Sequence, residues 1–304
     1  MSKNHNRKLE YCFPSSVNEA IALLEGGAGN SRIIAGGTDI LPDIRLGRIK
    51  PHRLVDITRI PGLNQIAITE DFVEVGAAVT FAKIKDTAFI TQNVHALAEA
   101  AASVGAVAIQ NAATWVGNLI QAMPAADGAI IAVALNAEAH LVDNKQAVWL
   151  PVESLFLGPG KSAVDPSRQL ITHIRFPREF GRRGTAWQRI GRRPSLVLPI
   201  INCAVTIQLD SDCETINHAT IALGPVALRP YRAYSAEDFI KGKPVSENTF
   251  EKTAQLVQQE SQPRDSITRG SREYRLAIIP TMVETALSTA ATRARNILIT
   301  QPPT

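Results

Sequence analysis

The segment Ile33-Ile34-Ala35-Gly36-Gly37-Thr38-Asp39 constrains the fold more than any other part of this 304-residue chain. An apolar run that ends in two glycines is typical of a strand that stops and turns. Because glycine lacks a Cβ and adopts positive φ, the main chain can curl there, and successive N–H groups can then point at one anion. The segment predicts a strand followed by a diphosphate-binding turn, although an ordinary strand-ending turn explains these residues equally well.

A second segment follows about eighty residues later and changes that balance. Thr114-Trp115-Val116-Gly117-Asn118-Leu119-Ile120 again combines a hydroxyl, a glycine and an amide beside apolar residues, and Asp127 follows in Ala122-Met123-Pro124-Ala125-Ala126-Asp127-Gly128. One glycine loop holds a phosphate weakly, whereas two loops that converge can enclose a dinucleotide. The pair therefore favours a dinucleotide site over an isolated turn.

The two segments resemble the "AGGTD" loop and the "T-x-G-G-N" loop with its following "P-x-x-D" in the FAD-binding subunits of molybdenum hydroxylases, the xanthine dehydrogenase and carbon monoxide dehydrogenase family. Further stretches are similar to family motifs in the same order: Leu157–Ser162, Gln169–Pro177, Arg189–Arg193, Leu223–Pro230 and Ser271–Ala277. The resemblance implies an α+β fold. Residues 1–180 would form a two-subdomain FAD-binding domain of the vanillyl-alcohol-oxidase-like (PCMH) type, and residues 181–304 a small α+β domain with a three-stranded antiparallel sheet and helices.

The same resemblance implies a set of FAD-binding residues, with the main chain of the first loop on the diphosphate and Asp127 helping to hold the cofactor. Asp127 could equally be a helix N-cap. Val104 and Ile171 map near the flavin or adenine, but a place in the apolar core is the better interpretation of both. The implied residues are Ile33, Ile34, Ala35, Gly36, Gly37, Thr38, Asp39, Ile40, Val104, Thr114, Gly117, Asn118, Asp127, Ile171 and Gln188.

The chain departs from the family pattern at three positions. Val116 replaces the first glycine of the second loop, and a β-branched residue adopts positive φ poorly, so either that loop is rearranged or the position takes ordinary backbone angles. Gln110 and Gln188 stand where the family commonly has arginine and lysine. Losing both cations would weaken charge compensation near the cofactor or change the potential of the flavin.

Composition and cysteine usage limit the classes of protein to which the chain can belong. With 45% hydrophobic and 20% charged residues, the chain is typical of a globular protein of two domains. Its polar first residues and the lack of a long apolar run predict a cytoplasmic protein with no membrane span. Cys12, Cys203 and Cys213 lack metal-ligand spacing, so any iron–sulfur cluster would belong to another subunit.

Other nucleotide and metal chemistries fit the sequence poorly. Gly158–Ser162 resembles a phosphate loop of nucleotide hydrolases, but Leu155 stands where that pattern needs glycine. The histidines show neither metal spacing nor a Ser-His-Asp context. An arginine-rich stretch, which we interpret as solvated linker charge or a docking face rather than a nucleic-acid site, contains Arg178, Arg182, Arg183, Arg189, Arg192 and Arg193.

The resemblance implies an FAD-carrying electron-transfer subunit. Substrate would be oxidised at a molybdopterin in a large subunit, and electrons would pass through [2Fe-2S] clusters in a small subunit to FAD and then to NAD, oxygen or a quinone. The alternative is a scaffold or assembly subunit that has lost FAD, and a self-sufficient flavin oxidoreductase is a third hypothesis.

Overall fold

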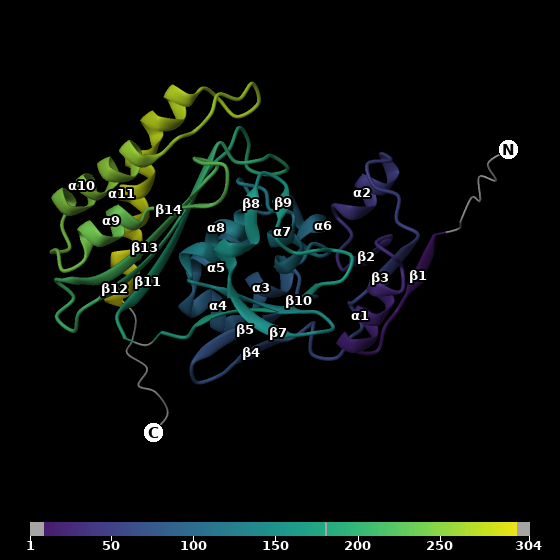
Figure 1. Cartoon of the computed structure of the whole chain (residues 1–304). Coiled ribbons are helices and arrows are strands. Elements are labelled where there is room, and N and C mark those ends of the chain that lie inside the picture. The colour runs from purple at the N-terminus through teal and green to yellow at the C-terminus, as the bar shows by residue number, and fades with distance from the viewer. Residues whose placement is uncertain (1–8, 180, 297–304) are drawn as a thin grey trace.

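The computed structural model describes residues 9–179 and 181–296. A small N-terminal subdomain lies at one end of the molecule, the C-terminal domain lies at the other, and a larger subdomain separates them (Figure 1). The small subdomain is a parallel sheet in the order β1-β3-β2, with two helices. Its elements are β1 (Glu10–Cys12), α1 (Val17–Glu25), β2 (Ser31–Ile34), α2 (Ile40–Arg45) and β3 (Arg53–Asp56).

The larger subdomain is a five-stranded antiparallel sheet in the order β4-β5-β10-β6-β7 with helices against it (Figure 1). Ile174 and Phe176 are buried while Arg175 between them is partly exposed, which is the alternation of a sheet with one covered face. α8 is buried at every position. The strands are β4 (Ile66–Ile68), β5 (Phe72–Gly76), β6 (Glu138–Val142), β7 (Ala147–Pro151) and β10 (Leu170–Pro177), and a short hairpin consists of β8 (Phe156–Gly158) and β9 (Lys161–Ser162). The helices are α3 (Phe81–Asp86), α4 (Ala88–Asn93), α5 (His95–Ser103), α6 (Val107–Gln110), α7 (Trp115–Ile120), α8 (Asp127–Ala134) and the 3₁₀ turn η1 (Val152–Leu155).

The C-terminal domain is an antiparallel sheet in the order β11-β12-β13-β14 with three helices on one face (Figure 1). Three strands are long, as expected, and the two-residue β14 adds a fourth. The long helix α11 packs directly on β11, because a Cβ on Gly184 would lie 1.8 Å from the carbonyl oxygen of Ala290. The elements are β11 (Arg183–Ile190), β12 (Ile201–Leu209), β13 (Ile216–Gly224), β14 (Tyr231–Arg232), α9 (Tyr234–Ile240), α10 (Glu247–Glu260) and α11 (Arg272–Asn296).

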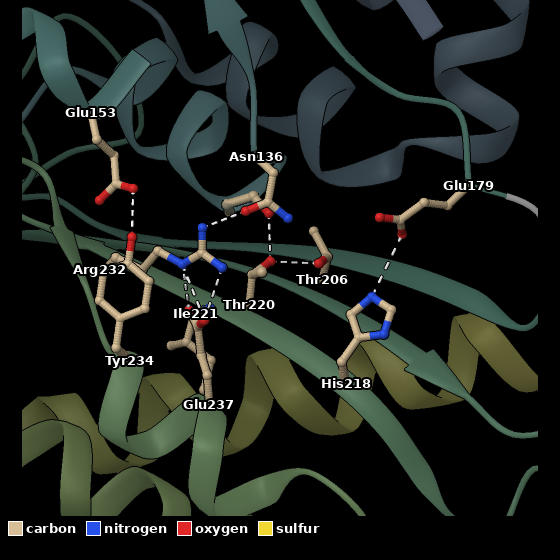
Figure 2. Close-up of polar contacts among 11 residues, drawn as sticks. Asn136, Glu153, Glu179, Thr206, His218, Thr220, Ile221, Arg232, Tyr234 and Glu237 are labelled. Atoms are coloured by element: carbon tan, nitrogen blue, oxygen red, sulfur yellow. Dashed lines mark hydrogen bonds and ion pairs between the residues drawn. The ribbon is translucent and has the colours of Figure 1, made fainter. Parts of the chain in front are cut away.

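Polar contacts join the two cores along one seam (Figure 2). Thr220 on β13 donates to the carbonyl oxygen of Ala134 at the end of α8 (2.5 Å). Arg232 binds both carboxylate oxygens of Glu237 and also donates to the Asn136 side chain. Further contacts across the seam join Tyr234 to Glu153, His218 to Glu179, Trp187 to Ser103 and Arg293 to Glu99. The C-terminal sheet is therefore anchored to α8 and to its neighbours.

The arginine-rich stretch differs from the prediction. Arg183 and Arg189 lie on β11 rather than in a solvated linker, and the side chains are 7% and 10% exposed. Each has a carboxylate partner: Arg183 pairs with Glu179 and Arg189 with Asp127. Solvated linker charge is the wrong interpretation for these two arginines, since a strand that pairs along its whole length with β12 positions them inside. Arg192 and Arg193, in the loop beyond β11, are exposed.

No helix in the described parts of the chain combines the length and the apolar character that crossing a bilayer needs.

Candidate cofactor site

The first glycine segment forms the strand and turn that the sequence predicts. β2 ends at Ile34, Gly37 has a φ of +70°, and α2 begins at Ile40. Asp39 precedes α2 but makes no capping bond; its carboxylate accepts from the Thr38 hydroxyl at 3.3 Å. Only glycine reaches such a φ without strain, so the turn at Gly37 needs this residue.

The first glycine segment lies against the two residues that directly precede the second segment. A Cβ on Gly36 would be 2.0 Å from the carbonyl oxygen of Ala112 and 3.0 Å from Cα of Ala113, the residue directly before Thr114. No side chain fits in that space, so Gly36 is the residue that permits the contact. The main chains of both segments therefore approach closely enough to face one ligand.

The second segment is the start of a helix rather than a glycine turn. Thr114 is the N-cap of α7, and its hydroxyl oxygen accepts from the Gly117 amide at 3.1 Å. Asn118 lies one residue further along the helix, and its Oδ1 is buried without a hydrogen-bond partner among the described residues. A buried acceptor without a donor is costly, so a ligand hydroxyl that supplies one would be stabilised there.

Val116 takes ordinary backbone angles within α7, and its side chain is buried in the core. Trp115 beside it is also a core residue: it is fully buried and donates from Nε1 to the carbonyl oxygen of Gly128 at 2.8 Å. Because helix positions point these side chains inward, the second segment needs no glycine at position 116. The first departure from the family pattern thus has a packing explanation.

Gln110 is buried, and its Nε2 donates to the carbonyl oxygens of Ala102 and Val104 at 2.8 and 3.0 Å. These carbonyls lie at the C-terminal end of α5, which has few other donors. Gln110 therefore holds the end of α5 and fixes the backbone at Val104.

Asp127 is the first residue of α8, and Ala126 occupies the N-cap position, so the N-cap alternative for Asp127 is wrong. The Asp127 carboxylate oxygen Oδ1 instead accepts from Nδ2 of Asn202 at 2.7 Å and from Nε of Arg189 at 3.3 Å. Burial raises the pKa of the carboxyl to about 6, although Arg189 and the hydrogen bond from Asn202 oppose the rise. Sequence reasoning missed both partners, since they lie in another domain.

The remaining candidates lie mostly in the core. Val104 is at the end of α5 and Ile171 on β10, and both belong to the buried cluster of the larger subdomain. Gln188 is partly exposed on β11. Adjacent residues of a strand face opposite sides, so Gln188 points away from the Arg189 face that meets Asp127. All three stay predictions as cofactor contacts.

In the described parts of the chain, no group of three or more histidine, cysteine, aspartate or glutamate side chains could hold a metal ion. Cys12, Cys203 and Cys213 are free thiols.

Three features suit a ligand that has a diphosphate and several hydroxyls: the glycine contact at Ala112, the unpaired acceptor of Asn118 and the buried carboxylate of Asp127. FAD has both. Amides from the Gly36–Gly37 turn would meet the diphosphate, and the two acceptors would meet hydroxyl donors.

Comparisons with known proteins agree with this chemistry. Residues 7–179 match the family model described as the FAD binding domain in molybdopterin dehydrogenase, and residues 186–290 match the carbon monoxide dehydrogenase flavoprotein C-terminal domain. The xanthine dehydrogenase FAD-binding subunit of Escherichia coli O157:H7 is 27% identical over 285 residues, which cover 93% of this chain and 96% of that one. The 6-hydroxypseudooxynicotine dehydrogenase complex subunit alpha of Paenarthrobacter nicotinovorans is 29% identical, over 94% of this chain and 95% of that one.

Among solved structures, a carbon monoxide dehydrogenase from Hydrogenophaga pseudoflava that lacks the Mo-pyranopterin moiety of its molybdenum cofactor superimposes with a TM-score of 0.87. It is 28% identical, over 94% of this chain and 98% of that chain. A family model that spans more than half of the chain, together with relatives matched over nearly their whole length, establishes the relationship. The chain belongs to the family of FAD-binding subunits of molybdopterin dehydrogenases, oxidoreductases of the xanthine and carbon monoxide dehydrogenase type.

Proposed function

We propose that this protein is the FAD-carrying medium subunit of a heteromeric molybdenum hydroxylase. Substrate would be oxidised on a molybdopterin-containing large subunit, and electrons would reach this chain from the [2Fe-2S] clusters of a small subunit. The FAD held here would deliver them to an acceptor such as NAD, oxygen or a quinone. The observation that supports this proposal is the direct contact of Gly36 with Ala112, because it places the first glycine segment beside the start of the second.

The residues of this chain would bind and orient FAD. Main-chain amides between Ile33 and Ile40 would hold the diphosphate, and Thr38 and Asp39 would add side-chain bonds. Thr114, Gly117, Asn118 and Asp127 would contact the cofactor from the second side. Bound FAD supplies the redox chemistry, while the protein supplies position, hydrogen bonds and potential.

We further propose that residues 1–180 are the FAD-binding domain and residues 181–304 the C-terminal domain, and that the protein works in the cytoplasm. Two separate clusters of buried apolar residues support two domains. Three free thiols suit a reducing compartment.

The test is the absorption spectrum and flavin content of the purified full chain, before and after incubation with excess FAD. About one FAD per chain is the expected result. A well-folded, colourless sample that takes up no FAD would exclude the electron carrier and leave the scaffold subunit. Co-expression with the two partner genes then tests the electron path, since substrate should bleach the flavin only in the complete complex.

A further inference from the structure

The C-terminal sheet reaches the carboxylate of Asp127 directly. Arg189 on β11 and Asn202 on β12 are opposite each other in the strand pairing, so both side chains project from the same face of the sheet. Asn202 is fully buried, and the side chains of Arg189 and Asp127 are 10% and 9% exposed. Nδ2 of Asn202 also lies 3.3 Å from the carbonyl oxygen of Ala125, so one amide holds both the segment before α8 and the first residue of that helix.

The approach of the sheet to this segment is tight. Gly224 on β13 is the strand partner of Asn202, and a Cβ there would be 2.4 Å from the carbonyl oxygen of Pro124. Arg189 is fixed as well, because its guanidinium donates to the carbonyl oxygen of Val197. Both partners of Asp127 are therefore held in place by the sheet and by the loop between β11 and β12.

Arg189 is the one charged group shown to act on Asp127 among the described residues. The elements packed against α8 are α5, α7, η1, β12, β13 and β14. Neither α7 nor β12 has a charged side chain, and those on the other four are His95, Glu99, Glu153, His218 and Arg232. Four of these five pair elsewhere: Glu99 with Arg293, Glu153 with Tyr234, His218 with Glu179 and Arg232 with Glu237. His95 is the first residue of α5; burial and the charge of Arg293 lower its pKa, and Glu99 opposes that change.

A carboxyl group as buried as that of Asp127 depends on a nearby cation to stay ionised. Burial favours the neutral acid, and a nearby opposite charge favours the ionised form. An ionised carboxylate accepts hydrogen bonds on both oxygens, whereas the protonated acid uses one oxygen as a donor. Ligand hydroxyls therefore bind the ionised form better, so any group that keeps Asp127 ionised strengthens the site.

We propose that Arg189 and Asn202 are positioning residues of the cofactor site: they keep the Asp127 carboxylate ionised and oriented, so that the C-terminal domain controls how tightly the N-terminal domain binds FAD. This inference rests on the proposed function.

The test is the dissociation constant of FAD for the deflavinated full chain, measured by fluorescence titration across pH. When only the ionised form binds, affinity falls about tenfold per pH unit below the pKa of Asp127. The wild-type midpoint should lie near 6, where the pKa of Asp127 lies. Loss of an adjacent cation raises the pKa of a carboxyl by about one to three units, so Arg189→Gln should move the midpoint upward by that amount. At pH 7 its affinity should fall between about twofold and a hundredfold.

Matched variants separate charge from structure. Arg189→Lys keeps a cation and should keep most of the wild-type profile, whereas Asp127→Asn should bind more weakly and lose this pH dependence. Asn202→Ala should shift the midpoint in the same direction as Arg189→Gln. Arg175→Gln is the control, because Arg175 is a partly exposed arginine whose carboxylate partner is Glu138, on a different sheet. It should leave the profile unchanged.

The outcomes distinguish the two proposals. A wild-type protein that binds no FAD at any pH would refute the proposed function. A wild-type protein that binds FAD, combined with an Arg189→Gln profile that superimposes on it, would overturn this inference alone. If Arg189→Gln does not fold, the protonation of Asp127 is measured in the wild-type protein by difference infrared spectroscopy against Asp127→Asn. An Asp127 carboxyl that is still protonated at pH 7 beside Arg189, or no effect of FAD on the Asp127 band, would also overturn it.

Discussion

Replacing Gly36 with alanine tests the contact on which the cofactor site depends. The new Cβ would lie 2.0 Å from the carbonyl oxygen of Ala112 and 2.7 Å from its carbonyl carbon. Both atoms belong to main chain, which cannot rotate away as the end of a side chain can. The main chain at Gly36 must therefore separate from the main chain at Ala112, beside the place where the diphosphate would lie.

The magnitude follows from the same distances. Real Cβ atoms essentially never come within 3.0 Å of such an atom, so the segments must move apart by at least 1.0 Å, the difference between 3.0 and 2.0 Å. Overpacking of this kind costs about 1–3 kcal/mol. If the separation of the segments weakens FAD binding by this free energy, the dissociation constant of FAD rises about 5-fold to 150-fold, at 1.4 kcal/mol per factor of ten.

The assay is FAD titration of deflavinated protein, with thermal unfolding of the same samples. Gly158→Ala is the matched control, because a Cβ at Gly158 meets nothing within 4 Å and its φ is not positive. It should bind FAD as the wild type does. Gly36→Ala should lose affinity although it remains folded, since the clash lies at the junction of two surface segments.

Binding by Gly36→Ala within twofold of the wild type would refute the reasoning, because the segments would then separate without consequence for the ligand. A loss of affinity shared equally by Gly158→Ala would refute it as well, since general effects of alanine would explain both variants.

Other predictions concern packing, the domain seam and thiol chemistry. Val116→Gly, which restores the family residue, should lower the free energy of unfolding by about 2–4 kcal/mol in urea denaturation without improving FAD binding, because it removes a buried side chain and weakens α7. Arg232→Ala should cost about 3 kcal/mol in the same assay because it leaves the carboxylate of Glu237 buried without its cation, and Glu237→Gln in that background should restore part of it. Burial raises the pKa of the Cys203 thiol to about 12, so a maleimide at pH 8 should label the other two cysteines in the folded protein and Cys203 only after unfolding, as peptide mass spectrometry would show. Labelling of Cys203 at the rate of the other cysteines would contradict its burial.

The sequence predicts the elements that have a strong periodic pattern. The helical pattern of Glu247–Glu260 predicts a helix and the run Phe72–Gly76 predicts a short strand, and α10 and β5 have these bounds. Ser16 and Glu19 together predict a capping box, and Gly26 predicts the end of that helix. In α1 the Ser16 hydroxyl accepts from the Glu19 amide, and Gly26 is the C-cap. Short helices such as α6 and α7 escaped prediction, since four to six residues carry too little periodicity to identify them.

Only those parts of the site that neighbouring residues in the chain form can be predicted from the sequence. The strand, glycine turn and helix around Gly36 depend on neighbours in the chain, so their residues determine them. The partners of Asp127 are 62 and 75 residues away, and they meet it only because β11 and β12 pair in one register and the sheet docks on α8. An arginine within a strand was the available signal for Arg189. The sequence does not show, however, that this side chain is buried.

In the structure, the departures from the family pattern argue less strongly against FAD binding than the sequence alone suggests. Val116 and Gln110 both point into the protein, where one fills the core and the other holds the end of α5, so neither side chain replaces a contact that faces the ligand gap. The cation that Gln188 lacks is not replaced by Arg189 one position later, because Arg189 projects from the opposite face of the strand, toward Asp127. A buried aspartate paired with an arginine is weak evidence of a role in stability alone, since replacing such a pair with apolar residues is often neutral or stabilising. The Asp127–Arg189 pair, together with the glycine that admits Ala112, therefore favours a flavin site over a scaffold without one.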